Sequence, residues 1–345
     1  GTITSQVSAN TEAGFSVVKY FSNFSSSNSA SVGHGLTQAP QIIISKGLDT
    51  TSNWRIRTNT ITGSPYDFLE FDTGSIGQLS SSDGTLNMPT DTKFDVNWNS
   101  SIGASGNTIA YCFAEVEGFS NFGSYVGNGS TSGPTVITGF EPAFIMFKNS
   151  SAIYEWVIVD NKRSIDNPRN KELNPNSSAA ENGTGDPTSI NFLENGFQII
   201  TPEGATNQNN GKIIYMAFAA DPTAVEPTLE DSFNTVTYTG NAPTTKVVTG
   251  VGFQPDLVWT KSRTTSADNN VVDSVRGLGN NVLRALSTNL TGAENTTTSN
   301  NILSLDSDGF TVQGSGSRTN SPGQDYVAWA WKGAEIPAIN SNGSI

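Results

Sequence analysis

Apolar residues occur along this chain in short runs that are rich in β-branched and aromatic side chains and bounded by Gly, Asn, Asp, Ser and Pro. Such runs predict β-strands, because these side chains suit a pleated, half-buried surface and the flanking residues form turns. Asn195-Gly196 and Asp308-Gly309 each precede an apolar run and predict hairpin turns. Only residues 282–286 suggest a helical turn, and no long pattern has a 3.6-residue period. We therefore predict an all-β fold.

The strand pattern occurs three times. Each copy has a landmark that consists of Gly, then Phe or Leu, then a Pro, and then an apolar run ending in Lys six residues after the Pro. The landmarks are Gly35-Leu36, Pro40 and Lys46; Gly139-Phe140, Pro142 and Lys148; and Gly252-Phe253, Pro255 and Lys261. A Tyr-containing strand precedes each landmark, at 17–20, 123–126 and 236–238, and an apolar strand closes each copy, at 109–114, 215–219 and 328–331.

The spacing of the copies predicts three tandem domains. Copies two and three keep one offset of 113 residues from Tyr125 and Tyr238 through to Phe218 and Trp331. Copy one is offset from copy two by 102 residues at Lys46 and by 105 near its end, so its length changes fall in the middle of the copy. We expect β-sandwich domains of jelly-roll or lectin-like type at 12–117, 118–222 and 231–335. Short connections between them predict a stiff rod or a compact stack.

The closing strands carry a shared packing signal. Phe113, Phe218 and Trp331 occupy one place in the repeat, and each follows a small residue (Cys112, Ala217 and Ala330, respectively). We predict that the three large aromatic residues are core residues in every copy.

Composition narrows the classes of function. The net charge is −13 and there is no basic run, which argues against a nucleic-acid partner. No apolar stretch has the length of a membrane span. Cys112 and His34 are the only residues of their types, so an internal disulfide is excluded, and neither a metal site nor a cofactor is expected. The absence of a catalytic set of residues leads us to expect that the chain is not an enzyme.

The repeated polar and aromatic residues are the candidates for binding, and each has a structural alternative that the sequence favours. Lys46, Lys148 and Lys261 could face a ligand at a strand end or could mark where a core strand meets solvent. Asp160 with Arg163, and Asp273 with Arg276, could bind an acidic or hydroxylated ligand or could form ion pairs that hold a loop. Trp54 and Trp156 could stack on sugars or could belong to the core; copy three has Asn269 at their position.

Three further candidates have a weaker basis. Asp306 and Asp308 resemble part of a calcium loop, but a hairpin turn explains the same residues. Glu70 and Asp72 could be a glycosidase-like carboxylate pair, although on a strand they would face solvent and no other copy repeats them. His34 precedes the first landmark and has no nucleophile signature nearby, which indicates a turn residue.

The motifs of copy two, at 123–129, 139–148, 156–160, 176–181 and 195–197, resemble a repeated domain of unknown function in marine phages, cyanophages among them, where it occurs in tail-fibre-like and other virion proteins. Copy one departs most, with Thr58 at the position of Asp160 and Asp273. The resemblance implies a structural role in a virion and no catalytic residues.

We therefore expect a structural or adhesion protein of a phage virion: a tail fibre, spike or capsid-attached appendage. Its partners would be other virion subunits and further copies of itself. It would be assembled in the bacterial cytoplasm and would then be extracellular. The alternative is a carbohydrate-binding array that recognises host surface glycans.

Overall fold

The fold is described from a computed structural model. It covers residues 2–23, 29–61, 63–64, 67–71, 76–78, 86–97, 105–182, 188–219, 232–279, 282–295, 301–334 and 337–340; Asp72 and the boundary positions 222, 231 and 335 lie outside these ranges. Within this part, strands make up every element except α1 (Gly204–Asn207), which confirms the all-β prediction. The helical turn predicted at 282–286 is wrong, because β23 (Val282–Leu283) lies there and pairs with β22 (Leu278–Gly279).

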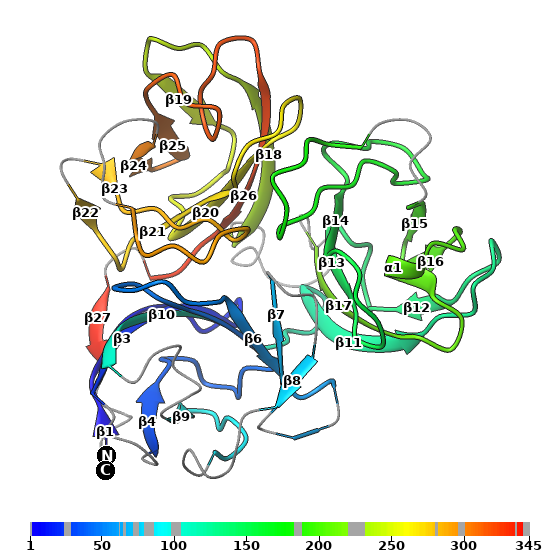
Figure 1. Cartoon of the computed structure of the whole chain (residues 1–345), viewed down its shortest axis with the longest axis horizontal. Helices are drawn as coiled ribbons and strands as arrows, with labels where there is room; N and C mark the ends of the chain where they lie inside the picture. Colours follow the sequence, from blue (N-terminus) through cyan, green and yellow to red (C-terminus); the bar gives the residue numbers. More distant parts are fainter. Residues whose placement is uncertain are drawn as a thin grey trace.

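Antiparallel sheets with one strand order recur in the three copies (Figure 1). Copy two has β11 (Ser120–Val126), β17 (Lys212–Phe218), β13 (Phe144–Asn149) and β14 (Val157–Asp160), in that order. Copy three has β18 (Phe233–Thr239), β26 (Asp325–Trp331), β20 (Leu257–Ser262) and β21 (Asn270–Asp273). Copy one has β3 (Phe15–Asn23), β10 (Ser105–Phe113), β5 (Ile42–Gly47) and β6 (Arg55–Thr58).

The sheet of copy one is longer, with eight strands. It is extended beyond β6 by β7 (Asp67–Glu70) and β8 (Ile76–Gln78), and beyond β3 by β2 (Ser5–Asn10) and β27 (Ala338–Asn340). The pairing of β27 with β2 brings the two chain ends together on copy one (Figure 1). Asp256 of copy three strengthens this closure, because it accepts hydrogen bonds from Ser8 Oγ and from the Gly333 amide, both at 2.7 Å.

A smaller sheet accompanies each of these larger sheets. The three sheets are β1 (Thr2–Ile3), β4 (Ser29–Gly33) and β9 (Lys93–Asn97) in copy one; β12 (Thr135–Ile137), β16 (Gly196–Ile199) and β15 (Ile190–Leu193) in copy two; and β19 (Lys246–Thr249), β25 (Gly309–Val312) and β24 (Ile302–Asp306) in copy three. In each copy a buried apolar cluster takes side chains from both sheets, a sandwich-like pairing. The hairpins predicted at Asn195-Gly196 and Asp308-Gly309 are confirmed as β15–β16 and β24–β25.

The copies do not lie in a row but surround a common centre (Figure 1), so the rod prediction is wrong. Phe113, Phe218 and Trp331 are at most 3% exposed and meet there, with ring centroids 5.9–6.1 Å apart in all three pairs. They are core residues as predicted, but of a core that the copies share.

Alternation along each closing strand explains how one strand serves two cores. Side chains at successive strand positions point to opposite faces. The large aromatic residue therefore enters the common core, while its small predecessor, Cys112, Ala217 or Ala330, lies in the cluster between the two sheets of its own copy.

Candidate functional site

The candidate binding residues lie mainly at contacts between copies, which we call junctions. Trp54 and Trp156 are 1% and 3% exposed. They and Asn269, which replaces Trp in copy three, each donate a side-chain N–H to a backbone carbonyl of another copy. The bonds run from Trp54 Nε1 to Ser287 (2.9 Å), from Trp156 Nε1 to Glu70 (3.1 Å) and from Asn269 Nδ2 to Pro175 (3.0 Å). Copy one thus contacts copy three, copy three contacts copy two, and copy two contacts copy one, which closes a ring.

The landmark lysines are also buried, each at 0% exposure. Lys46 Nζ donates to the Thr291 carbonyl of copy three (2.9 Å), and Lys261 Nζ donates to the Ser177 carbonyl of copy two (2.7 Å). Lys148 donates to the Tyr154 carbonyl in its own copy. Burial lowers the pKa of Lys148 and of Lys261 to about 8, against a weaker opposing effect of neighbouring carboxylates.

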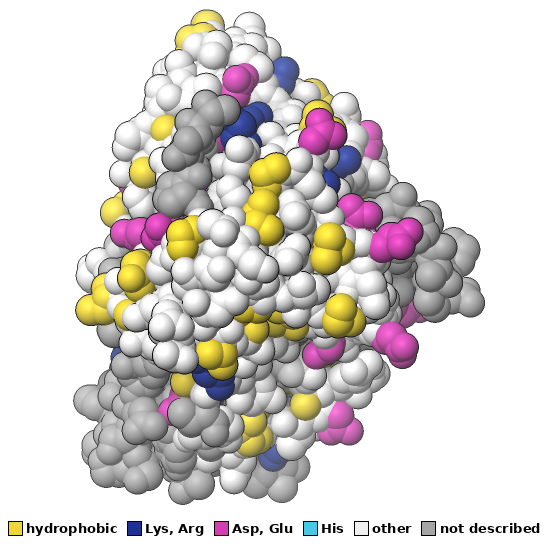
Figure 2. Space-filling view, turned by 90° about the vertical axis from the view of Figure 1, so that its right-hand side faces the viewer, with side chains coloured by type: hydrophobic (Ala, Val, Ile, Leu, Met, Phe, Trp, Pro, Cys, Tyr) yellow, Lys and Arg dark blue, Asp and Glu magenta, His cyan; other side chains and the backbone are white. Residues whose placement is uncertain are grey.

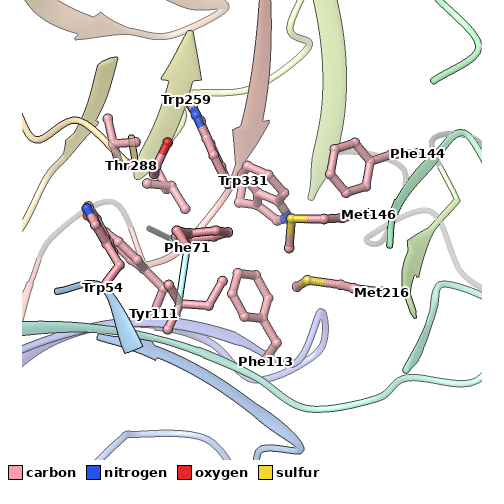
Figure 3. A pocket seen from close by; sticks show the side chains of 13 residues that line it. Trp54, Phe71, Tyr111, Phe113, Phe144, Met146, Met216, Trp259, Thr288 and Trp331 are labelled. Atoms are coloured by element: carbon pink, nitrogen blue, oxygen red, sulfur yellow. The ribbon is translucent and has the colours of Figure 1, made fainter. Parts of the chain in front are cut away.

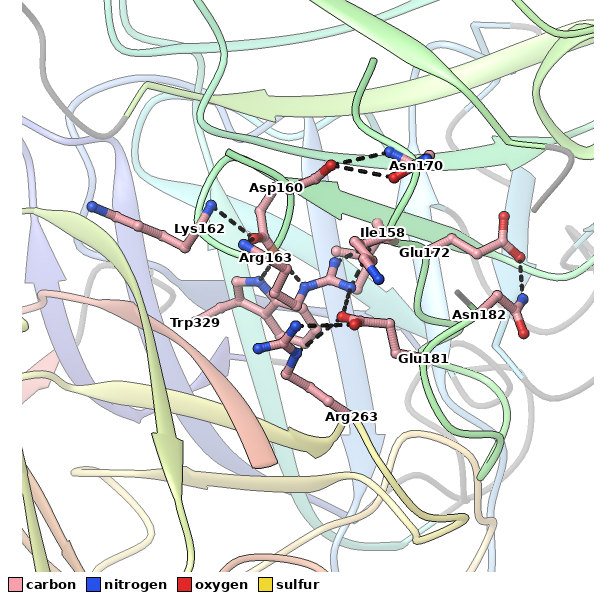
Figure 4. A network of polar contacts seen from close by, with 12 residues as sticks. Ile158, Asp160, Lys162, Arg163, Asn170, Glu172, Glu181, Asn182, Arg263 and Trp329 are labelled. Carbon is pink, nitrogen blue, oxygen red and sulfur yellow. Dashed lines mark hydrogen bonds and ion pairs between the residues drawn. The ribbon is translucent and has the colours of Figure 1, made fainter. Parts of the chain in front are cut away.

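The Asp–Arg pairs form buried networks at two junctions. Arg163 Nε lies 2.7 Å from Asp160 Oδ2, and both side chains are fully buried. Arg163 also pairs with Glu181 at 3.1 Å, and Glu181 pairs in turn with Arg263 of copy three at 3.0 Å (Figure 4). Trp329 of copy three completes this network by donating its Nε1–H to Asp160 Oδ2 at 3.0 Å (Figure 4).

An equivalent network joins copies three and one. Arg276 Nε lies 2.5 Å from Asp273 Oδ2, and Arg276 also pairs with Glu294 at 3.3 Å. Tyr111 of copy one donates its hydroxyl proton to Asp273 Oδ2 at 2.8 Å. Burial alone would lower the pKa of Arg276, but the charge of Asp273 and its neighbours outweighs burial, and the pKa is raised.

The third junction, between copies two and one, has no equivalent Asp–Arg pair. The positions equivalent to Tyr111 and Asp273 are Met216 in copy two and Thr58 in copy one, so both the donor and the carboxylate are replaced. Packing takes their place: Phe71 of copy one lies 5.0 Å from Trp156 of copy two, between ring centroids. This is also the junction with the short, direct chain connection at 114–119.

The ring centre contains a small cavity of about 20 Å³ (Figure 3). Its walls come from all three copies and are almost entirely apolar, with Trp54, Tyr111, Phe113, Phe144, Met146, Met216, Trp259, Thr288 and Trp331 among them. A space of this size accommodates about one water molecule, and apolar walls give that water too few hydrogen-bond partners. The centre is therefore a packing core and offers no room for a ligand.

The remaining sequence candidates have local structural contacts. Glu70 is buried and lies 3.5 Å from Arg55, whereas Asp72 lies outside the described residues. Asp308 accepts the amides of Gly250 and Gly252 at 3.1 and 2.7 Å, which lowers its pKa and fits a turn residue. Within the described part of the chain, no cluster of three or more His, Cys, Asp or Glu side chains could hold a metal ion. No helix there is long and apolar enough to cross a membrane.

His34 is buried, and its ring contacts backbone groups of residues 36 and 90. Its Nδ1 accepts the Leu36 amide (3.1 Å) and its Nε2 lies 3.0 Å from the Thr90 carbonyl, which fits the neutral ring with the proton on Nε2. Burial lowers the pKa of His34.

Tyr111 and Trp329 are junction residues that the sequence analysis did not identify. The signal was present, because both occupy one position of the closing strand, two residues before Phe113 and Trp331. Comparing the copies shows that copy two lacks the donor, with Met216, and that copy one lacks the carboxylate, with Thr58; only the structure shows that these two positions face each other.

These observations define an all-β protein whose three sequence copies close around one aromatic core, with buried polar networks between copies. The chain belongs to the family described as Domain of unknown function (DUF7483), whose model matches residues 1–222 and 228–345. The match covers the three copies together as one family domain, whereas the resemblance led us to expect a family of one repeated unit. No curated protein matches the chain.

Proposed function

We propose that the chain is a structural or adhesion component of a phage virion, built from three β-sandwich domains at about 12–117, 118–222 and 231–335. One observation carries this proposal: the polar and aromatic residues that recur in the copies are used largely to join one copy to another. Side chains committed to buried contacts stabilise a rigid body and are not available to turn over a substrate. A tail fibre, a spike and a capsid-attached appendage all need such a body.

The surface supports an exposed role on a particle. Figure 2 shows one face on which, among the described residues, apolar side chains lie in small groups among scattered acidic and basic side chains. A net charge of −13 on such a surface favours solubility and disfavours binding to a membrane or a nucleic acid. We propose that other virion subunits and further copies of the chain are its partners.

Labelled particles test this function. Antibody fragments raised against the purified chain should decorate phage particles in electron micrographs at one repeated location, and mass spectrometry of washed particles should contain its peptides. Particles that lack the chain and remain undecorated, while the chain is abundant in infected cells, would show that it is not a virion component.

A second candidate function is recognition of a host surface glycan. It is favoured by one observation, a pocket on copy one lined by charged and amide side chains, of which Asp67 is buried. A glycan array probed with the intact chain tests it. Binding that is confined to one glycan class would support it, and uniform background binding would contradict it.

A further inference from the structure

Copy one carries a charged residue where the other copies carry a core valine. In the paired strands, Arg57 lies opposite Ile43, in the register in which Val159 lies opposite Ile145 and Val272 lies opposite Val258. The residue equivalent to Arg57 is therefore Val159 in copy two and Val272 in copy three. Both valines are fully buried between the two sheets of their copies. Arg57 itself is half-buried, so its guanidinium is only partly desolvated; packing alone does not require a charge at this position.

The guanidinium of Arg57 is held in place but is not neutralised. Its Nη1 donates to the Asp95 carbonyl at 2.8 Å, and its central carbon lies 5.6 Å from the centroid of the Phe94 ring. That is one hydrogen bond for a group with five N–H donors. No carboxylate among the described residues lies within ion-pair distance of Arg57. Burial lowers the pKa of Arg57, against weaker opposing effects of Tyr20, Cys112 and Asp95.

A pocket lies at the same place. It is lined by Arg57, the amides of Asn59 and Asn87, the carboxylate-bearing Asp67 and an apolar rim that includes Pro40 and Met88, and its free volume is about 20 Å³. Asn87 is fixed by its own contacts, because its backbone and side-chain N–H groups donate to Asp95 Oδ2 at 3.0 and 2.7 Å. The pocket admits one small group, and the remainder of a larger ligand would lie across the rim.

The lining indicates the chemistry of that group. The N–H donors of Arg57 match a carboxylate, which a guanidinium binds through two parallel charge-assisted hydrogen bonds. The side-chain amides of Asn59 and Asn87 can accept or donate hydrogen bonds to hydroxyl groups beside it. A carboxylate and hydroxyl groups on one small ring are the features of an acidic sugar.

We propose that this pocket of copy one binds the carboxylate of an acidic sugar, with Arg57 as the residue that pairs with it. The proposal deepens the glycan-recognition candidate and is independent of the virion role. Failure of sugar binding would leave the decoration of particles by antibody unchanged, so the two can be told apart.

Calorimetric titration of the intact chain tests the proposal with three probes: methyl glucuronide, its neutral analogue methyl glucoside, and acetate. We expect measurable binding of the glucuronide and at least about tenfold weaker binding of the glucoside, because loss of the charged pair removes 1.4 kcal/mol or more. In a ¹H–¹⁵N spectrum, the Arg57 Nε–H resonance should shift with the glucuronide. Acetate binding as tight as that of the glucuronide would overturn the sugar part of the proposal.

The decisive variant is Arg57→Val, which places in copy one the residue that the other copies already accommodate. It should fold with undiminished stability and bind the glucuronide at least about tenfold more weakly. Arg55→Gln is the matched control, because Arg55 lies on the same strand, pairs with Glu70 and does not line the pocket; its affinity should equal that of the wild type. Equal glucuronide binding by Arg57→Val and wild type, or no binding by wild type, would overturn the proposal. If the Arg57→Val chain does not fold, Arg57→Gln, which keeps a polar side chain, provides the binding measurement, and glucuronide binding equal to that of the wild type would overturn the proposal.

Discussion

Truncation of Phe218 at the ring centre should destabilise the whole chain and not only copy two. The ring is 1% exposed, and its neighbours come from all three copies. They are Phe113, Phe119, Phe122, Phe144, Phe233 and Trp331, at centroid distances of 5.2–6.1 Å. Phe-to-Ala changes in a core cost about 3–5 kcal/mol through lost transfer energy and the cavity that remains. We expect the upper part of that range, because neighbours fixed in three different sheets have little freedom to collapse.

Denaturant unfolding of the intact chain, followed by tryptophan fluorescence and by circular dichroism, measures this effect. Since the centre is shared, the Phe218→Ala chain should show one transition at lower denaturant by both probes. Ile153→Ala is the control, because Ile153 is 76% exposed and its loss should change the free energy of unfolding by no more than about 0.5 kcal/mol. A change below about 1 kcal/mol for Phe218→Ala, or three separate transitions in the wild type, would refute the shared-core reasoning.

Three more changes test the junctions and the buried ionisable groups. Tyr111→Phe removes the donor to buried Asp273 and should lower the free energy of unfolding by about 1.5–3 kcal/mol. Met216→Leu, at the equivalent position of the junction without a carboxylate, should lower it by less than about 1.5 kcal/mol. Chemical denaturation measures both variants, and equal losses of stability would contradict the assigned contact. His34 has a lowered pKa in the folded state, so the unfolded chain takes up its proton first as pH falls below 6.5. The stability of the wild type should therefore decline from pH 7 towards 5.5 more steeply than that of His34→Gln. Parallel stability profiles of the two chains would exclude this contribution. Lys261 has a folded-state pKa of about 8 against 10.5 when unfolded, so the folded state loses its proton first and stability should rise between pH 8 and 10.5. In thermal melts, Lys261→Met should lack that part of the rise. An unchanged rise in the variant would contradict the role of Lys261.

Local features of the fold could be predicted from the sequence. The landmark strands, the closing strands and the hairpins at Asn195-Gly196 and Asp308-Gly309 are all present, because alternation of side chains and the backbone preferences of turn residues act over a few positions. The burial of Phe113, Phe218 and Trp331 was predictable as well, since three copies kept bulk at one position of a strand.

The arrangement of the copies and the roles of the polar residues were decided only by the tertiary structure. A repeat reveals which positions are equivalent, but it does not reveal which copy faces which. The contact of Trp329 with Asp160 spans 169 residues of chain, and that of Tyr111 with Asp273 spans 162. The repeat aligns Arg57 with Val159 and Val272, but only the structure shows that both valines are buried and that Arg57 lines a pocket. Such pairings depend on how whole sheets pack around a common centre, and no local pattern of hydrophobic and polar residues encodes that packing.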